Sequence, residues 1–425
     1  MNDFEGFGLS QELKQAIQEL GITTPTEIQE QSIPAVIKGK DVVGESATGS
    51  GKTLAFGCAI VDHLDKGKGI QSLILTPTRE LCEQVKSNLV QLSRHKGLKV
   101  ISIYGGVSYE PQLKGLHSAD VVVATPGRLL DHLQQKNINL SKVSILIMDE
   151  ADRMFDMGFI DDVEKIIRQC PKERQTLFFS ATISTRVREL AGRHMKEWVE
   201  VRANNQVDPS LLTQMYYDVA RGLKLSLLVH LLKKEQTGLV MVFCNTRHTT
   251  DFVVKNLKAN GISAIAIHGG LSQNRRTKTI TDFGGAKAQI LVATDVAARG
   301  LHIENVSHVY NYEIPSDPKD YVHRIGRTAR AGEEGKIVNL VADVDHDNFG
   351  RLIYEYREFK VPKSATPNVP RIVALREERQ DRGRFGRGSQ RSGPRHGPPS
   401  IDGSRNRSPR GHPPSHHRRG PPRRR

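Results

Sequence analysis

Several features are scarce in this chain of 425 residues, and each scarcity excludes a class of protein. The four cysteines, Cys58, Cys82, Cys170 and Cys244, lie far apart, which excludes a disulfide framework and a cysteine-based zinc site. No apolar run approaches the length of a membrane-spanning helix, and the first residues do not form a signal peptide. These absences predict a protein of the reducing cytoplasm.

Acidic residues and lysine are scarce at the end of the chain. Residues 371–425 contain 16 Arg, no Lys and 4 acidic residues, a net charge of +12 out of +15 for the whole sequence. The end of the chain also lacks the apolar residues that a core requires, so we expect a disordered basic tail at 363–425. Its single sign of charge favours contact with a nucleic acid backbone, although a purely solubilising tail would have a similar composition.

A phosphate-binding loop follows a short predicted strand at 41–45. The loop, Ser46-Ala-Thr-Gly-Ser-Gly-Lys52-Thr53, leads directly into an apolar helix. In this context backbone N–H groups and the helix N-terminus cradle phosphates. Lys52 then reaches the β- and γ-phosphates, and the Thr53 hydroxyl binds Mg²⁺. Ser46 stands where the general pattern has glycine, so the match is incomplete at that position.

Three carboxylates follow a continuous apolar run at 145–148. Such a run predicts a strand buried on both faces, which delivers the residues after it to the ligand crevice of an open α/β sheet. Asp149 is placed to hold Mg²⁺, and Glu150 to orient and deprotonate a water molecule. The alternative for Asp149, Glu150 and Asp152 is a strand that ends in a solvated acidic turn.

Predicted strands and helices alternate along most of the chain, which is typical of an α/β protein with parallel sheets. The first domain, 1–202, has strands at 41–45, 72–76, 99–104, 121–124, 143–148 and 176–179, and a polar linker follows at 203–211. The second domain, 212–362, has strands at 215–218, 239–244, 264–268, 290–293, 308–310 and 336–341. It has no phosphate-binding loop, so we expect it to form the other wall of a cleft.

A basic segment in the second domain could face that cleft. On a helix, His323, Arg327 and Arg330 would fall at positions i, i+4 and i+7, on one face. Facing a nucleotide, these side chains would stabilise transition-state charge on the γ-phosphate. The alternative is a solvated basic surface.

The motifs and their order resemble those of the DEAD-box RNA helicases over residues 4 to about 360. The matching segments are Pro25-Thr-Glu-Ile-Gln29, Ala47-Thr-Gly-Ser-Gly-Lys-Thr53, Pro77-Thr-Arg-Glu-Leu81, Thr125-Pro-Gly-Arg128, Asp149-Glu-Ala-Asp152, Ser180-Ala-Thr182 and His323-Arg-Ile-Gly-Arg-Thr-Ala-Arg330. The resemblance implies two tandem RecA-like domains, with ATP and Mg²⁺ as cofactors and RNA as partner.

The resemblance also implies roles at the ATP site. Gln29 would recognise the adenine edge and Phe4 would stack on the base, while Arg327 and Arg330 would act as arginine fingers. Ser180 and Thr182 would link hydrolysis to strand separation through contact with Asp152, and His323 would help to couple the two domains. The residues implied for nucleotide and metal binding are Phe4, Gln29, Ala47, Thr48, Gly49, Ser50, Gly51, Lys52, Thr53, Asp149 and His302, with Thr53 and Asp149 for the metal.

RNA would lie across both domains and be held mainly through sugar and phosphate, with little base specificity. The residues implied in the first domain are Pro77, Thr78, Arg79, Gly105, Gly106, Thr125, Gly127 and Arg128. Those implied in the second domain are Asn245, Gly269, Gln273, Arg276 and Thr294.

Three positions depart from the family pattern. Ser46 replaces a small apolar residue and Ala329 replaces a glycine, and both changes are expected to be mild. His302 stands where the family has an aspartate that would hold the ribose hydroxyls. An imidazole can form hydrogen bonds but is not an anion, so we expect weaker or pH-dependent nucleotide binding.

The leading hypothesis is an ATP-dependent RNA helicase that opens short duplexes as its two domains close. An ATP-gated RNA clamp with little unwinding would use the same residues. A DNA helicase of the wider superfamily is a third possibility, and the Gln29 segment and the Asp149-Glu-Ala-Asp152 quartet argue against it.

Overall fold

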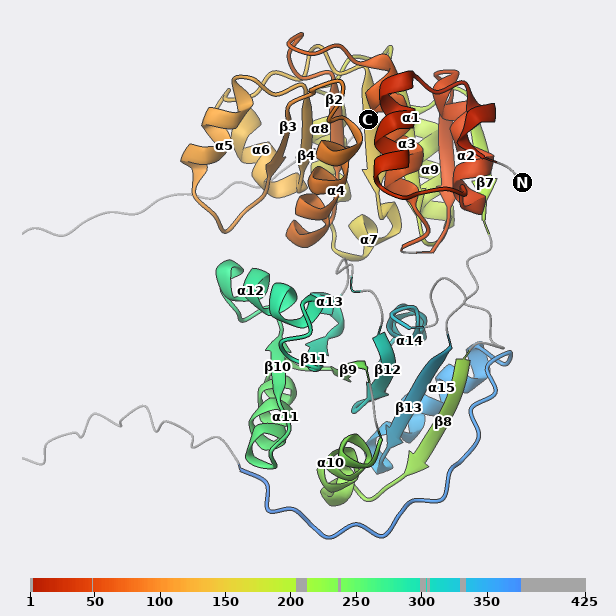
Figure 1. Ribbon diagram of the computed structural model, residues 1–425, viewed down its shortest axis with the longest axis vertical. Coiled ribbons are helices and arrows are strands. Elements are labelled where there is room, and N and C mark those ends of the chain that lie inside the picture. Colours follow the sequence, from red (N-terminus) through yellow and green to blue (C-terminus); the bar gives the residue numbers. More distant parts are fainter. Residues whose placement is uncertain are drawn as a thin grey trace, which may run out of the picture. The chain divides into compact units, whose positions relative to one another are not determined.

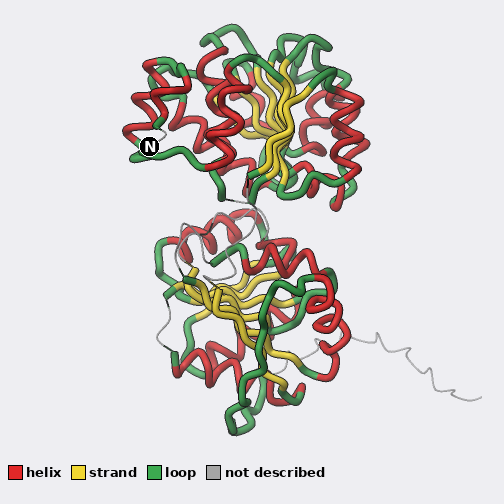
Figure 2. The backbone as a smooth tube through the Cα atoms, turned by 90° about the vertical axis from the view of Figure 1, so that its right-hand side faces the viewer, coloured by secondary structure: helices red, strands yellow, loops and turns green. Residues whose placement is uncertain are grey.

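The computed structural model describes residues 3–47, 49–203, 212–235, 238–298, 303, 306–328 and 334–375, and contains two β-sheets (Figure 1). Separate parts of the chain form the two sheets, up to residue 202 and from residue 212. Each sheet is covered by helices on both faces, as Figure 2 shows. The predicted α/β fold with two successive parallel sheets is confirmed.

The first sheet has seven strands in the order β3-β4-β2-β5-β6-β1-β7, and every neighbouring pair is parallel. Its strands are β1 (Asp41–Glu45), β2 (Ser72–Leu75), β3 (Val100–Ile103), β4 (Val121–Ala124), β5 (Ile145–Asp149), β6 (Gln175–Ser180) and β7 (Trp198–Arg202). The edge strand β7 was not predicted from the sequence. Only Val201 among its five residues is buried, so its apolar pattern is weak.

The helices of this part pack on the two faces of the sheet. They are α1 (Gln11–Glu19), α2 (Glu27–Ile37), α3 (Lys52–His63), α4 (Arg79–Leu92), α5 (Tyr109–Leu116), α6 (Pro126–Gln134), α7 (Ala151–Asp156), α8 (Ile160–Ile167) and α9 (Thr185–His194), after a short 3-10 helix η1 (Phe4–Phe7). In β5, Ile147 packs on the face covered by α1 to α4, whereas Leu146 and Met148 pack on the opposite face. Because neighbouring strand residues point to opposite faces, a strand buried on both sides is apolar throughout.

The second sheet has six parallel strands in the order β10-β11-β9-β12-β13-β8. Its strands are β8 (Leu212–Asp218), β9 (Leu239–Cys244), β10 (Ala264–Ile267), β11 (Ile290–Thr294), β12 (Val306–Asn311) and β13 (Gly335–Val341). Its helices are α10 (Lys224–Lys234), α11 (Arg247–Ala259), α12 (Gln273–Gly284), α13 (Asp295–Ala298), α14 (Pro318–Ile325) and α15 (His346–Glu355), with 3-10 helices η3 (Arg221–Leu223) and η4 (Asp343–Asp345).

The predicted basic helical face at His323, Arg327 and Arg330 is wrong. Helix α14 ends at Ile325, and the Arg327 N–H bonds to Arg324 O in a turn at 3.2 Å. Gly326 follows the helix directly, and glycine is a poor helix former. His323 therefore lies on the helix and Arg327 beyond it, while Arg330 lies outside the described residues.

Residues 363–375, which we call the C-terminal strap, belong to the second domain and not to the tail predicted from residue 363. Val369 is buried among side chains of the second sheet and its helices, and Ile372 and Ala374 pack against the same cluster. The Leu375 N–H donates to Asn256 Oδ1 at 2.7 Å, and Asn256 Nδ2 donates back to Leu375 O at 3.1 Å. These few apolar contacts and paired hydrogen bonds hold a segment whose composition alone suggested disorder.

Across the described part of the chain, no helix combines the length and the apolar character needed to cross a bilayer. Within the same residues, no group of three or more His, Cys, Asp or Glu side chains is arranged to hold a metal ion.

Candidate ATP site and RNA interface

Three neighbouring strands, β5, β6 and β1, bring the predicted catalytic segments together at their carboxyl ends. β1 is followed by the phosphate-binding loop, β5 ends in Asp149, and β6 ends in Ser180. All three strands are parallel, so their carboxyl ends meet at one edge of the sheet, where open α/β sheets bind ligands. Segments separated by more than 100 positions in the sequence thus form one site.

The phosphate-binding loop holds the Lys52 ammonium inside itself. Lys52 Nζ donates to Ser46 O at 2.8 Å and to Ala47 O at 3.1 Å, and the side chain is buried. Ser50 Oγ donates to Ser46 Oγ at 2.7 Å, so the serine that departs from the general pattern closes the loop. Gly49 and Gly51 have positive φ values of 89° and 88°. Thr48 lies outside the described residues.

Gln29 joins its own helix to this loop. Its Oε1 accepts from the Thr26 N–H at 2.9 Å as part of a capping box at the start of α2. Its Nε2 donates to Gly51 O at 3.0 Å. A Cβ at Gly51 would lie 2.2 Å from this Nε2 atom, so the close approach of the amide requires glycine. Gln29 therefore connects the start of α2 to the loop that precedes α3.

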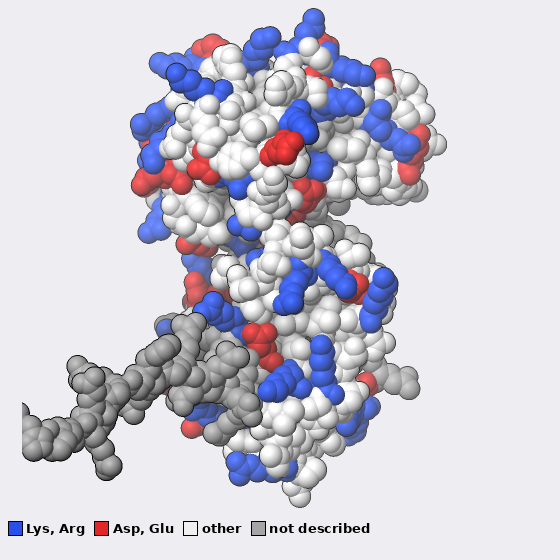
Figure 3. Space-filling view, turned by 90° about the vertical axis from the view of Figure 1, so that its left-hand side faces the viewer, with Lys and Arg blue, Asp and Glu red and all other residues white. Residues whose placement is uncertain are grey.

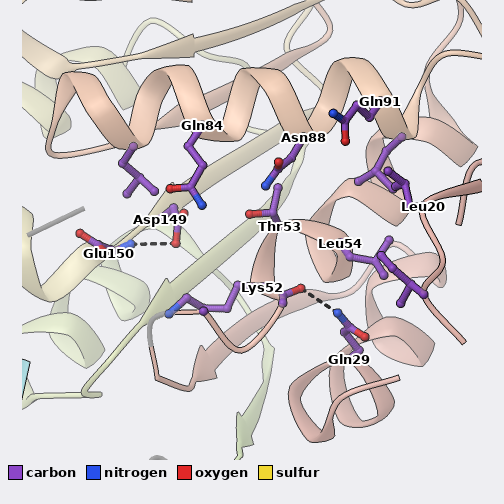
Figure 4. A pocket seen from close by; sticks show the side chains of 15 residues that line it. Leu20, Gln29, Lys52, Thr53, Leu54, Gln84, Asn88, Gln91, Asp149 and Glu150 are labelled. Carbon is purple, nitrogen blue, oxygen red and sulfur yellow. Dashed lines mark hydrogen bonds between the residues drawn. The ribbon is translucent and has the colours of Figure 1, made fainter. Parts of the chain in front are cut away.

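A cavity of about 300 Å³ opens beside the loop (Figure 4). Lys52, Thr53, Asp149 and Glu150 line it, and Figure 4 shows Gln84 and Asn88 of α4 pointing toward Thr53 and Asp149. The other lining residues are Leu20, Ile22, Gln29, Gly49, Gly51, Leu54, Leu81, Gln91 and Leu92. On α4, the amide side chains that line the cavity are Gln84, Asn88 and Gln91, at positions i, i+4 and i+7. This spacing is visible in the sequence, but the sequence analysis missed it.

Phe4 lies in the hydrophobic core of the first domain, and stacking of its ring on a bound base stays a prediction. Phe4 is only 7% exposed, belongs to the core cluster and contacts the Phe7 ring edge-on, and it is not among the residues that line the cavity. Two apolar residues that follow α1, Leu20 and Ile22, do line the cavity.

Asp149 and Thr53 present oxygen atoms to the same cavity. Asp149 is 3% exposed, and its Oδ1 accepts from the Glu150 N–H at 3.0 Å. Burial raises the pKa of Asp149 to about 7, against the opposing effect of the Lys52 ammonium. A buried carboxylate and a hydroxyl are the hard oxygen ligands that Mg²⁺ prefers, so these two residues fit a magnesium ion. They are also two ligands rather than a complete protein cage, which is usual where phosphates complete the coordination.

Glu150 is held by Arg153, a residue that the sequence analysis missed. Arg153 Nη1 lies 2.7 Å from Glu150 Oε2, and the two side chains are 7% and 6% exposed. Burial opposes the charged form of Glu150, but the Arg153 guanidinium and the Lys52 ammonium outweigh it and keep the pKa of Glu150 below its usual value. Glu150 has φ 54°, a left-handed conformation that is uncommon outside glycine. The i, i+3 spacing was the available sequence signal for this pair.

Asp152 contacts both of the residues expected to partner it. The Asp152 N–H donates to Ser180 Oγ at 3.1 Å. Asp152 Oδ2 accepts from the Thr182 N–H at 3.1 Å and from Thr182 Oγ1 at 3.2 Å. The quartet that follows β5 is therefore hydrogen-bonded to the segment that follows β6.

The eight residues expected to hold RNA in the first domain follow three neighbouring strands, β3, β4 and β2. Thr78 caps α4 by accepting from the Leu81 N–H, and Thr125 is the cap residue of α6. The Arg79 guanidinium lies against Gly106, where a Cβ would come within 2.1 Å of Nη1. The starts of α4 and α6 and the pair Gly105-Gly106 thus lie at one edge of the sheet. The neighbouring strands β5, β6 and β1 carry the nucleotide site. Pro77, Gly105, Gly127 and Arg128 complete this set.

The five residues expected to hold RNA in the second domain follow β9, β10 and β11, which are also neighbours. Asn245 follows β9, Thr294 ends β11, and Gly269 follows β10, with Gln273 and Arg276 on the first turns of α12. The Asn245 side chain is already engaged, because Oδ1 accepts from Arg324 Nη2 at 2.9 Å and Nδ2 donates to Ile314 O at 2.8 Å.

Arg324 is a second functional candidate that sequence reasoning missed. Its side chain is 1% exposed and pairs with Asp295 through Nε and Nη2 at 2.6 and 2.8 Å. It also donates to Asn245, to Asn311 Oδ1 and to Glu313 O. This guanidinium therefore connects the ends of β9, β11 and β12. His302 lies outside the described residues.

Comparisons with family models, with individual sequences and with solved structures agree with one another. The sequence matches the family model for DEAD/DEAH box helicases over residues 26–190 and that for the helicase conserved C-terminal domain over residues 223–332. It is 43% identical over 345 residues to the DEAD-box ATP-dependent RNA helicase CshA of Geobacillus kaustophilus, covering 80% of this chain and 74% of that protein. It is 42% identical to the ATP-dependent RNA helicase CshA of Listeria monocytogenes, covering 80% of this chain and 66% of that relative's length.

The structure resembles that of S. cerevisiae Dbp5 bound to RNA and ADP BeF3, with a TM-score of 0.78 and 28% sequence identity. The match covers 86% of this chain and 96% of the Dbp5 chain. The similarity therefore extends over both sheets and their helices.

Proposed function

Because this chain belongs to the DEAD-box family of ATP-dependent RNA helicases, we propose that it hydrolyses ATP to open short RNA duplexes locally as its two domains close. The observation that carries this proposal is the cavity lined by Gln29, Lys52, Thr53, Asp149 and Glu150. It combines a phosphate-binding loop, oxygen ligands for a metal and a carboxylate base. The predicted cytoplasmic location remains a prediction.

In this mechanism, the N-terminus of α3 and the Lys52 ammonium bind the β- and γ-phosphates. Thr53 and Asp149 would hold Mg²⁺, which would supply positive charge to offset that of the phosphates. Glu150 accepts a proton from the attacking water, and its lowered pKa keeps it in the basic form at neutral pH. Arg327 and Arg330 from the second domain would supply the remaining positive charge.

RNA binding would use the sheet edge formed by the ends of β3, β4 and β2, together with the ends of β9, β10 and β11 in the second domain. Helix N-termini and backbone N–H groups there suit phosphate oxygens, so contacts would be largely independent of base sequence. Lys and Arg side chains are spread widely over the face shown in Figure 3, which suits the same ligand.

Coupling between the two events would pass through Asp152. Its backbone lies close to Glu150 in the chain, and its hydrogen bonds reach Ser180 at the end of β6 and Thr182 just beyond it. A displacement of either segment would therefore change the position of the base relative to the phosphates.

The test is RNA-stimulated ATP hydrolysis measured beside strand displacement of a short duplex. Lys52→Ala is expected to abolish both activities nearly completely, whereas the exposed Lys68→Ala serves as a matched control and should change neither. Glu150→Gln should retain nucleotide binding and lose turnover. Full turnover in Glu150→Gln would remove this residue as the base. Hydrolysis without any displacement in the wild-type protein would favour an RNA clamp over a helicase.

A further inference from the structure

Three side chains on the proposed RNA-binding edge of the first domain form a stack. The Arg128 guanidinium carbon lies 4.2 Å from the centre of the Tyr109 ring, within the range of a cation–π contact. The His132 ring lies 4.7 Å from the same Tyr109 ring at an angle of 44°. Arg128 and His132 are one turn apart on α6, and Tyr109 is the first residue of α5. A single aromatic ring thus contacts two successive turns of the neighbouring helix.

The stack restrains Arg128 without using up its hydrogen-bonding capacity. The arginine side chain is 10% exposed, and Nη1 donates to Val107 O at 3.2 Å, in the segment between β3 and α5. Its Nε atom forms a long ion pair with the half-exposed Asp131, at 3.8 Å from Oδ2. A guanidinium has five N–H donors, so a phosphate oxygen can still be bound by the others. Restraint before binding matters because a free arginine side chain loses rotamer entropy when a ligand fixes it.

His132 has an unusual environment for a polar residue. It is fully buried, and neither Nδ1 nor Nε2 has a hydrogen-bond partner among the described residues. Burial, together with the nearby Arg128 charge, lowers the pKa of His132. A neutral ring without hydrogen bonds contributes packing alone, and the tilted Tyr109 ring packs against it. The packing of His132 therefore fixes Tyr109, and Tyr109 in turn fixes Arg128.

We propose that Tyr109 is a positioning residue for RNA binding: it holds the Arg128 guanidinium at the start of α6, where it meets the sugar-phosphate backbone. Arg128 contacts the Tyr109 ring and donates a hydrogen bond to Val107 O, and these two interactions hold the loop after β3 and the loop after β4 in one relative position. The inference rests on the proposed RNA-binding function, because it assigns Arg128 a phosphate contact. The chemical class of ligand is an RNA phosphate, recognised through charge and not through base identity.

The decisive measurement is the salt dependence of RNA binding, because tyrosine carries no charge at neutral pH. Dissociation constants for single-stranded oligouridylate are measured over a range of salt for the wild type, Tyr109→Ala, Arg128→Ala and the double variant. When a protein neutralises one phosphate fewer on a single strand, the slope of log K against log salt becomes shallower by about 0.7. We expect Tyr109→Ala to reduce the slope as Arg128→Ala does, and to weaken binding about three- to tenfold at low salt.

The double variant distinguishes positioning from a direct contact. If Tyr109 acts through Arg128, the double variant binds no more weakly than Arg128→Ala alone. Independent effects that multiply, or an unchanged salt slope in Tyr109→Ala, would mean that the tyrosine contacts RNA itself and would overturn the proposal. Tyr109→Phe preserves the ring and should restore both affinity and slope.

A matched control is available in the second domain. Tyr354 on α15 is 73% exposed, and the Arg357 guanidinium carbon lies 4.6 Å from its ring centre. Tyr354→Ala removes an equivalent contact away from the proposed interface and should leave the slope unchanged. ATP hydrolysis without RNA should be the same in Tyr354→Ala as in the wild type. Unchanged RNA binding in Arg128→Ala would refute the phosphate contact and this proposal with it, whereas absence of RNA binding in the wild type would refute the proposed function itself.

Discussion

Gln29 Nε2 donates to the carbonyl oxygen of Gly51 at 3.0 Å, across the space where a side chain at position 51 would begin. The same amide closes the capping box of α2 through Oε1. The start of one helix and the start of the next are thus joined through one buried glutamine. The geometry of the loop therefore depends on a side chain whose recognition of adenine stays a prediction.

This contact predicts that Gly51→Ala abolishes nucleotide binding. The added Cβ would lie 2.2 Å from Gln29 Nε2, and φ at this position is 88°, which alanine adopts only with strain. Titration with a fluorescent ATP analogue measures the effect. Gly192→Ala on α9, where a Cβ meets nothing within 4 Å, is the control and should bind normally. Normal affinity in Gly51→Ala would show that the loop relaxes without cost.

Arg153→Leu should destabilise the first domain by roughly 3 kcal/mol, because it leaves the buried Glu150 carboxylate without its closest partner. Urea unfolding measures the change. The pair Lys114–Glu110 is the contrast: its side chains are 77% and 73% exposed, so Lys114→Leu should have little effect. The double variant Arg153→Leu/Glu150→Leu should recover much of the stability. Similar stabilities for Arg153→Leu and the wild type would mean that water replaces the guanidinium.

His132→Phe should make the protein more resistant to acid. The pKa of His132 is lowered in the folded state, so the unfolded chain binds more protons as pH falls through about 6.5. The wild type therefore loses stability from this group below that pH, and loses nothing from it above. The variant keeps a ring against Tyr109 but cannot be protonated. Thermal midpoints at pH 8 and pH 5.5 should differ less in the variant; an equal difference would contradict the prediction.

Two truncations separate the strap from the rest of the C-terminal region. Removal of 376–425 should lower RNA affinity and reduce the salt slope, because it removes most of the Arg-rich sequence, while stability and RNA-independent hydrolysis stay unchanged. Removal of 363–425 should in addition destabilise the second domain, because it exposes the surface covered by Val369, Ile372 and Ala374. Equal stabilities for the two truncations would show that the strap adds nothing to the fold.

Elements with a strong local pattern could be predicted from the sequence. Three local signals were sufficient to predict the two sheets and, in each, the edge where the strands end. They are the apolar run of β5, the glycines before Lys52, and the small or polar residues after each strand. These signals are local and repeat with a fixed period. The C-terminal strap and β7 have no such signal, because their few apolar residues become informative only when a surface exists for them to cover.

Residues that act by packing were harder to recognise than residues that carry charge. Base stacking by Phe4 was implied by the family resemblance, whereas the packing of its ring in the core was not foreseen. The sequence analysis overlooked Arg153, Arg324 and Tyr109. Arg324 and Tyr109 have partners on other elements, and the partner of Arg153 lies just before a helix whose start was not known from the sequence. The end of α14 was predicted too far along the chain, because the helical spacing of His323, Arg327 and Arg330 was assumed to continue through Gly326.

The hydrogen bonds of Lys52 to Ser46 O and Ala47 O give the loop an internal competitor for its own cation. These two bonds occupy two of the three ammonium N–H groups, so one donor stays available to an anion in the cavity that Lys52 lines. The two carbonyl oxygens also fix the direction of the ammonium, so the loop orients its own cation before any ligand arrives.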